Sequence, residues 1–142
     1  MYQALDVALP KLVVDANAVP GKVVLAVVEG DVHDIGKNIV KAMLTGAGLT
    51  IYDMGRDVPV KNIVEKAKAE NAQILAASTL MTPTLSSMKE IERMLAEENL
   101  KGKIKTIIGG GATSKEFAAQ IGTDGWAYDA VEAVQVVQNL LK

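Results

Sequence analysis

The chain has 142 residues, of which 49% are hydrophobic, no cysteine and a formal net charge of −2. This length and composition predict one compact domain whose core needs no disulfide or metal to hold it. The absence of cysteine excludes a disulfide framework and a cysteine nucleophile, and it favours a cytoplasmic location. One Trp, three Tyr, one Phe and no basic stripe argue against nucleic acid as a partner. The longest aliphatic run, VVLAVV, is too short to span a membrane.

Residues 1–20 are expected to form a residual helix and a linker, because an apolar stretch containing Pro10 precedes the turn-rich run DANAVPGK. From residue 21 onward, apolar runs alternate with amphipathic stretches, which is typical of βα units around a parallel sheet. Strands are expected at residues 23–28, 49–54, 73–78, 104–108 and 125–128. Apolar residues at helical spacing indicate helices that include residues 39–47, 63–67, 85–95, 117–121 and 131–141.

This order of elements predicts an α/β fold for residues 21–142. We expect a flavodoxin-like (Rossmann-like), doubly wound, five-stranded parallel sheet in three layers, α/β/α. Ligands of such sheets bind at the carboxyl ends of the strands, near the point where the strand order reverses. The loops to examine are therefore EGDVHDIG after the first strand, STLMTPT after the third and GGGATS after the fourth.

The first of these loops looks like a phosphate-binding loop but does not satisfy the pattern. Five residues separate Gly30 from Gly36 where a Walker loop has four, and Asn38 stands in place of the Ser or Thr that would hold magnesium. The run GGGATS does not complete a dinucleotide fingerprint and follows the wrong strand. The sequence therefore argues against a nucleotide phosphate at either loop.

What remains is the chain's single histidine, His33, with Asp31 two residues before it. A carboxylate that accepts the proton of one ring nitrogen orients a histidine whose other nitrogen binds a metal. One histidine without cysteine cannot build a zinc site. A metal bound here would have to bring its other ligands with it, as the metal of a tetrapyrrole-like macrocycle does.

DVHDIG resembles the DxHxxG signature of cobalamin-binding domains. The resemblance continues through GKNIV, GRDVP at 55–59, STLMTPT at 78–84 and GG at 109–110, and covers nearly all of residues 21–142. The sequence is similar to the small corrinoid proteins of methyltransferase systems and to the cobalamin domain of methionine synthase. Relatives of this kind carry an N-terminal helical bundle, of which residues 1–20 would be the end.

This resemblance implies that His33 is the lower axial ligand of cobalt, in place of the cofactor's own benzimidazole, so that cobalamin binds base-off. Asp31 would hold the far nitrogen of the ring, and Thr84 would end the relay. Asp34 also stands where the side chain of a helix N-cap would be. The implied cofactor contacts are Asp31, Val32, His33, Asp34, Ile35, Gly36, Ser78, Leu80, Thr82, Thr84, Gly109, Gly110 and Gly111, with the GG pair at 109–110 or one residue later.

The function implied is that of a corrinoid protein that carries a methyl group, as methylcobalamin formed from Co(I) cobalamin or a related corrinoid. Methyl-donor and methyl-acceptor methyltransferase proteins are the implied partners, with a reductive activation protein as a third. The carrier would be a subunit of a methyltransferase system rather than a complete enzyme. Two alternatives stay open. One is the cobalamin subunit of an adenosylcobalamin-dependent mutase, whose loop resembles DGHDRG and from which Val32 and Ile35 depart. The other is a non-catalytic cobalamin sensor or storage module.

Overall fold

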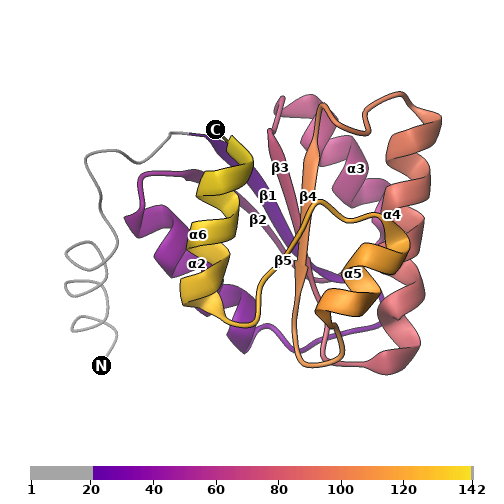
Figure 1. Ribbon diagram of the computed structural model, residues 1–142, viewed down its shortest axis with the longest axis horizontal. Helices are drawn as coiled ribbons and strands as arrows, with labels where there is room; N and C mark the ends of the chain where they lie inside the picture. Colours follow the sequence, from indigo (N-terminus) through magenta and orange to yellow (C-terminus); the bar gives the residue numbers. More distant parts are fainter. Residues whose placement is uncertain (1–20, 142) are drawn as a thin grey trace.

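Residues 21–141 are described by the computed structural model, and they form a parallel β-sheet between two layers of helices (Figure 1). The strands are β1 (Lys22–Val28), β2 (Thr50–Val58), β3 (Ile74–Ser78), β4 (Lys105–Gly109) and β5 (Gly125–Trp126). The helices are α2 (Ile35–Gly46), α3 (Val60–Ala69), α4 (Leu85–Glu97), α5 (Lys115–Ile121) and α6 (Ala130–Leu141), with the short 3-10 helix η1 (Thr82–Thr84) before α4. The helix and linker predicted for residues 1–20 lie outside the described residues.

The strand order is β2-β1-β3-β4-β5, and every neighbouring pair is parallel. The chain moves outward in one direction from β1 to β2 and in the other from β3 to β5. The predicted doubly wound topology is therefore confirmed. Its switch point lies between β1 and β3, so the loops after these two strands are neighbours at the carboxyl edge.

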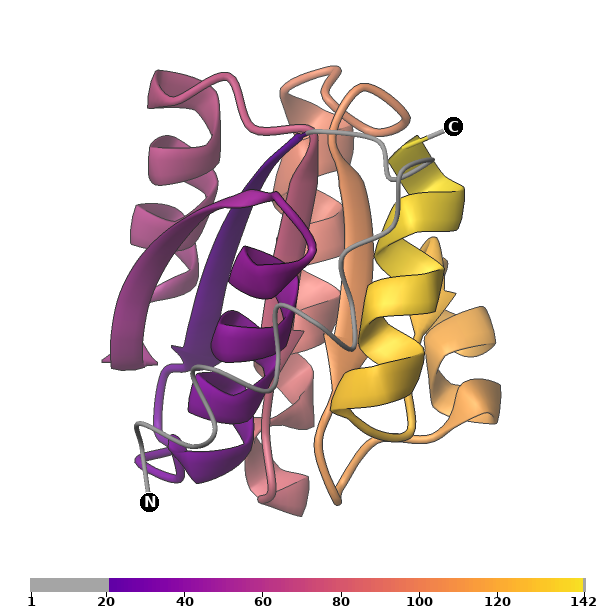
Figure 2. The same cartoon turned by 90° about the vertical axis from the view of Figure 1, so that its left-hand side faces the viewer.

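Two helices, α2 and α6, cover one face of the sheet, and α3, α4 and α5 cover the other (Figure 2). The buried side chains of β1 alternate between the two faces: Val23 and Leu25 pack in the α2/α6 core, and Val24, Ala26 and Val28 pack in the α3/α4/α5 core. A strand covered on both faces must be apolar at every position, which explains the run VVLAVV.

The predicted elements differ most from the structure at the two edge strands. β2 continues to Val58 because a bulge absorbs the polar run after Asp53: Leu25 pairs with Asp53, but Ala26 pairs with Gly55. An edge strand tolerates such an insertion because only one of its sides is paired. β5 is reduced to two residues, which pair with Ile107 and Ile108.

No helix among residues 21–141 has both the length and the apolar composition that a bilayer span requires.

Candidate functional site

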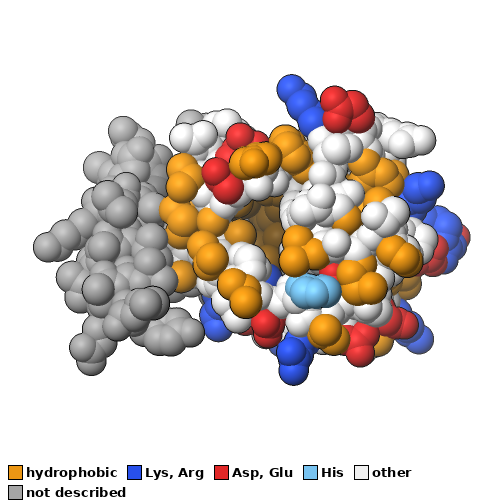
Figure 3. Space-filling view, turned by 90° about the horizontal axis from the view of Figure 1, so that it is seen from below, with side chains coloured by type: hydrophobic (Ala, Val, Ile, Leu, Met, Phe, Trp, Pro, Cys, Tyr) orange, Lys and Arg blue, Asp and Glu red, His pale blue; other side chains and the backbone are white. Residues whose placement is uncertain are grey.

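The three glycine- and hydroxyl-rich loops lie together at the carboxyl edge of the sheet. They follow β1, β3 and β4, and β3 pairs with both of the others. Seen from this edge, His33 lies beside a hollow that hydrophobic side chains surround (Figure 3). The topology therefore brings the predicted ligand and the predicted cofactor loops to one place.

His33 is held by Asp31 through two hydrogen bonds. Oδ1 of Asp31 lies 2.7 Å from Nδ1 of His33 and also accepts the backbone N–H of His33 at 2.8 Å. The side chain of Asp31 is 0% exposed, whereas that of His33 is 51% exposed. Because a carboxylate only accepts, Nδ1 carries the proton and Nε2 keeps a free lone pair. The ring is thus prepared to donate that lone pair to a metal.

The other carboxylate oxygen of Asp31 is also paired. Oδ2 accepts the hydroxyl of Thr79 at 2.5 Å and the backbone N–H of Leu80 at 2.7 Å. Burial raises the pKa of Asp31, but the hydrogen bonds from Thr79, His33 and Leu80 together outweigh it and hold the pKa well below its ordinary range. Asp31 is therefore an anion at any physiological pH.

In the structure Thr79 lies between Thr84 and Asp31, so the predicted relay from Thr84 would reach Asp31 through Thr79. The hydroxyl of Thr84 contacts that of Thr79, and its oxygen also lies 2.8 Å from the carbonyl oxygen of Met81. Thr79 occupies the unspecified position of the SxL pattern, where the resemblance assigns no role. The only signal for it in the sequence is its place one residue beyond a buried strand.

The histidine loop is also braced from β2. Asp57 accepts the backbone N–H of Gly30 through Oδ1 at 2.8 Å, and its own N–H donates to the carbonyl of Asp31 at 2.9 Å. Asp57 itself adopts the left-handed conformation, with φ of 54°. The GRDVP stretch thus supports the loop that carries His33.

Around His33, apolar side chains point outward. Ile35 is 77% exposed, and Val32 and Leu80 are each more than half exposed. Asp34 occupies the N-cap position of α2, but contrary to expectation its side chain accepts no capping hydrogen bond; its carbonyl accepts the N–H of Asn38 instead. A cluster of exposed apolar residues around a metal-ligating type of side chain indicates a surface that a ligand covers.

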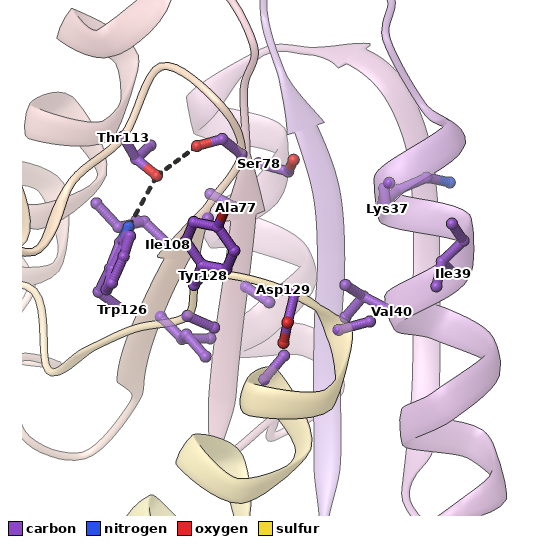
Figure 4. A pocket seen from close by; sticks show the side chains of 18 of the residues that line it. Lys37, Ile39, Val40, Ala77, Ser78, Ile108, Thr113, Trp126, Tyr128 and Asp129 are labelled. Atoms are coloured by element: carbon purple, nitrogen blue, oxygen red, sulfur yellow. Dashed lines mark hydrogen bonds between the residues drawn. The ribbon is translucent and has the colours of Figure 1, made fainter. Parts of the chain in front are cut away.

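A cavity of about 980 Å³ opens next to His33, between α2, α6 and the ends of β1, β3 and β4 (Figure 4). This volume is at the upper end of the range for small-molecule sites. Its deep walls are apolar, formed by Leu25, Leu44, Ala76, Ile107, Ala133 and Val137. Among the predicted contact residues, it is lined by His33, Gly36, Ser78, Leu80, Gly109, Gly110 and Gly111, while Thr82 lies exposed at the start of η1 outside the lining.

One of the three consecutive glycines is required by packing. Gly110 has φ of +106°, and a Cβ there would lie 2.0 Å from the carbonyl oxygen of Thr79. A Cβ at Gly109 would lie 3.3 Å from the carbonyl oxygen of Ala127, and one at Gly111 would lie 3.2 Å from a methyl carbon of Leu80, so both positions are less crowded. Gly110 belongs to the predicted GG pair in either register. Gly36 differs, since a Cβ there would meet nothing within 4 Å in the described chain although the residue lines the cavity.

Trp126 and Tyr128 form a wall of the cavity. The indole Nε1–H of Trp126 donates to Oγ1 of Thr113 at 3.0 Å, and Thr113 donates to the carbonyl of Gly110 at 2.7 Å. The two rings pack edge to face, with centroids 6.3 Å apart. The wall is therefore tied to the glycine loop.

A buried ion pair lies at the wall of the cavity, which Lys37 helps to line. Nζ of Lys37 lies 2.6 Å from Oδ1 of Asp53, with the two side chains 3% and 18% exposed. Burial raises the pKa of Asp53, but Lys37 and the backbone N–H of Gly55 outweigh it, so that the pKa is lowered. This pair connects the first turns of α2 to the bulge of β2.

Comparison with known proteins agrees with this geometry. The profile of the B12-binding domain matches residues 21–135. A dimethylamine corrinoid protein of Methanosarcina mazei is 48% identical over 121 residues, which cover 85% of this chain and 56% of the relative. The chain thus spans little more than half the length of this relative.

Two solved structures are similar in both sequence and fold. The monomethylamine corrinoid protein of Methanosarcina barkeri has a TM-score of 0.82 and 34% identity, covering 97% of this chain and 64% of that one. The methanol:cobalamin methyltransferase complex of the same organism has a TM-score of 0.80 and 38% identity, covering 89% of this chain and 49% of that one. With the profile match over most of its length and these relatives, the chain belongs to the B12-binding domain family, whose cofactor is a corrinoid.

Proposed function

We propose that this chain binds cobalamin or a related corrinoid base-off, with His33 as the lower axial ligand of cobalt, and carries a methyl group between partner methyltransferases. The observation that supports this most directly is the pairing of an exposed imidazole with a buried, permanently anionic Asp31. The imidazole lies at the mouth of a large apolar cavity.

The residues present fit a corrinoid. A macrocycle lying over His33 would cover the exposed side chains of Val32, Ile35 and Leu80. The cavity beside it has room for a nucleotide tail displaced from the metal, and its apolar walls suit a planar aromatic base. A bound corrinoid supplies the cobalt centre that accepts and releases the methyl group.

The chain's own contribution is to hold and polarise the ligand. Asp31 keeps the proton on Nδ1 of His33 and thereby increases the electron density that Nε2 can donate. Gly110 lets the loop after β4 pass against the backbone of Thr79, which keeps the cavity open between two loops. Asp57 fixes the loop that carries both Asp31 and His33.

Partners and substrate class follow from the relatives. Their names include dimethylamine and monomethylamine corrinoid proteins and a methanol:cobalamin methyltransferase complex. We therefore propose that a small methylated amine or alcohol is the methyl source and that separate methyltransferase proteins supply the donor and acceptor sites. A reductive activation protein would return oxidised cobalt to the active state.

The ligand assignment is tested by anaerobic reconstitution with cobalamin and Co(II) electron paramagnetic resonance. His33 is the only histidine, so ¹⁵N-histidine marks one residue. We expect a nitrogen splitting that changes with the label, vanishes in His33→Ala and persists in Glu29→Gln, a control at an exposed residue of the same loop. Bound cobalamin without this splitting contradicts ligation by His33, and absence of binding contradicts the whole proposal. The carrier role is tested by adding methylamine- or methanol-specific methyltransferases to the loaded chain and following methyl transfer.

A further inference from the structure

Thr79 is a buried hydroxyl that none of the patterns in the sequence assigns a role. Its side chain is 0% exposed, and its Oγ1 lies 2.5 Å from Oδ2 of Asp31. The same oxygen accepts the backbone N–H of Met81 at 3.1 Å and contacts the hydroxyl of Thr84. Thr79 therefore lies at the centre of the group that holds Asp31.

The backbone of Thr79 is fixed from the opposite side by the loop after β4. The N–H of Thr79 donates to the carbonyl of Gly109 at 3.2 Å, and Gly110 packs against its carbonyl so closely that no Cβ fits between them. The hydroxyl is thus presented to Asp31 by a backbone that has little room to move.

The directions of the hydroxyl protons follow from counting donors and acceptors. The hydroxyl of Thr79 donates a hydrogen bond to Oδ2 of Asp31, since a carboxylate oxygen accepts. Thr79 must then accept a hydrogen bond from the hydroxyl of Thr84, since two hydroxyl oxygens in contact without a hydrogen between them would repel each other. The resulting order is Thr84 to Thr79 to Asp31. Thr84 can alternatively donate to the carbonyl of Met81, which makes it the weaker contributor.

We infer that Thr79 is a positioning residue that draws charge from Asp31 and thereby sets how strongly Asp31 polarises His33, and that Thr84 acts only through Thr79. The role rests on the function proposed above for Asp31 and His33. Hydrogen-bond donors compete for the charge of one carboxylate, so removing the hydroxyl leaves Asp31 a stronger acceptor for Nδ1–H of His33. The donor strength of His33 would then depend on a residue three contacts away from the metal.

The test uses four variants of the full chain: Thr79→Val, Thr79→Ser, Thr84→Val and Thr106→Val. Thr106 is the matched control, because it is 1% exposed and its hydroxyl donates to a carboxylate oxygen of Glu92 at 2.5 Å, the same arrangement as Thr79 and Asp31. The ring nitrogens of the single histidine are read by ¹⁵N NMR through its carbon-bound protons. The spectra are recorded at about pH 8.5, some two units above the ordinary pKa of histidine.

We expect Thr79→Val to shift the Nδ1 resonance of His33 toward that of an unprotonated nitrogen. Thr84→Val should produce a smaller shift in the same direction, because it weakens only the donor strength of Thr79. Thr79→Ser should match the wild type, since it keeps the hydroxyl, and Thr106→Val should change stability without moving the histidine signals. In the Co(II) cobalamin form, the nitrogen splitting from His33 should increase most in Thr79→Val and less in Thr84→Val. It should not change in Thr79→Ser or Thr106→Val.

Three results would overturn the inference. They are a Thr84→Val shift at least as large as that of Thr79→Val, a Thr79→Ser shift equal to that of Thr79→Val, and no shift in a Thr79→Val variant that remains folded by circular dichroism. The NMR arm needs no cofactor. A wild type that fails to bind cobalamin would therefore count against the proposed function alone, while the NMR result would still decide the role of Thr79.

Discussion

A single oxygen of Asp31, Oδ1, accepts both the ring Nδ1–H of His33 at 2.7 Å and its backbone N–H at 2.8 Å. The two bonds fix the main chain and the side chain of His33 with one acceptor. Because Oδ2 is occupied by Thr79 and Leu80, the carboxylate has no freedom to rotate away. The orientation of the ring is therefore determined before any cofactor binds.

The lowered pKa of Asp31 predicts a specific dependence of stability on pH. In the unfolded chain Asp31 should titrate near pH 3.9, so its contribution to the free energy of unfolding is complete above that value and is lost as the pH falls toward its folded pKa. Below about pH 4 the wild type should lose up to about 1.4 kcal/mol more per pH unit than Asp31→Asn. Urea unfolding between pH 3 and 7 measures this difference. Asp53, whose pKa is also lowered, is present in both proteins and contributes equally to both slopes, so equal slopes would contradict the prediction for Asp31.

Replacing Gly110 with alanine should be far more costly than replacing Gly48. Both glycines have a positive φ, +106° and +91°, but only at Gly110 would the new Cβ meet the backbone of Thr79. We expect Gly48→Ala to destabilise by about 1 kcal/mol from the backbone conformation alone. Gly110→Ala should cost at least about 3 kcal/mol, because the clash adds to the strain. Thermal and urea unfolding compare the two variants, and similar losses would show that the loops can separate.

Gly36→Leu should raise stability and lower cobalamin affinity. Gly36 lies in the first turn of α2, and the space where its Cβ would be is free of protein atoms within 4 Å. Replacing a helical glycine by a good helix former contributes about 0.5–1 kcal/mol. The same side chain would enter the cavity that Gly36 lines. Unfolding curves and cobalamin titration measure the two effects, and unchanged affinity would place the cofactor elsewhere.

The ion pair of Lys37 and Asp53 should show a large coupling free energy. In a double-mutant cycle with Lys37→Met and Asp53→Asn, we expect about 1–3 kcal/mol, because Asp53→Asn leaves the buried charge of Lys37 without its carboxylate partner. In Lys37→Met, Asp53 keeps Lys41 at 3.3 Å. Arg93 and Glu97 on α4 provide the comparison; both side chains are more than half exposed, so their coupling should be close to zero. Equal couplings would mean that burial does not strengthen the Lys37 pair.

Most of the fold follows from local patterns. The all-apolar run of β1 and the helical spacing of Met88, Ile91 and Leu95 predict buried elements that the structure contains. The end of β2 does not follow, because the bulge at Asp53 and Gly55 puts polar residues inside a strand and interrupts the alternation that strand prediction uses. β5 was predicted too long, since only its first two residues find a ladder partner.

The site could be predicted in part. Asp31 and His33 are two residues apart, so their pairing follows from the sequence and from the resemblance to cobalamin-binding domains. The contacts of Thr79 with Asp31 and of Asp57 with Gly30 join residues 48 and 27 positions apart. Whether such residues meet depends on strand register and on the exact path of two loops. Neither contact leaves a local pattern that could have identified it.

The two walls of the cavity differ in how firmly they are anchored. The side of the cavity that carries His33 and Ser78 lies at the ends of β1 and β3, central strands joined by five consecutive ladder pairs. The opposite wall grows from β5, an edge strand held by two pairs, and from α6. In hydrogen exchange, amides around Trp126 and Tyr128 should therefore open well before those of the histidine side. If a corrinoid binds as proposed, its tail would displace the β5 side of the cavity more easily than the loop that holds His33.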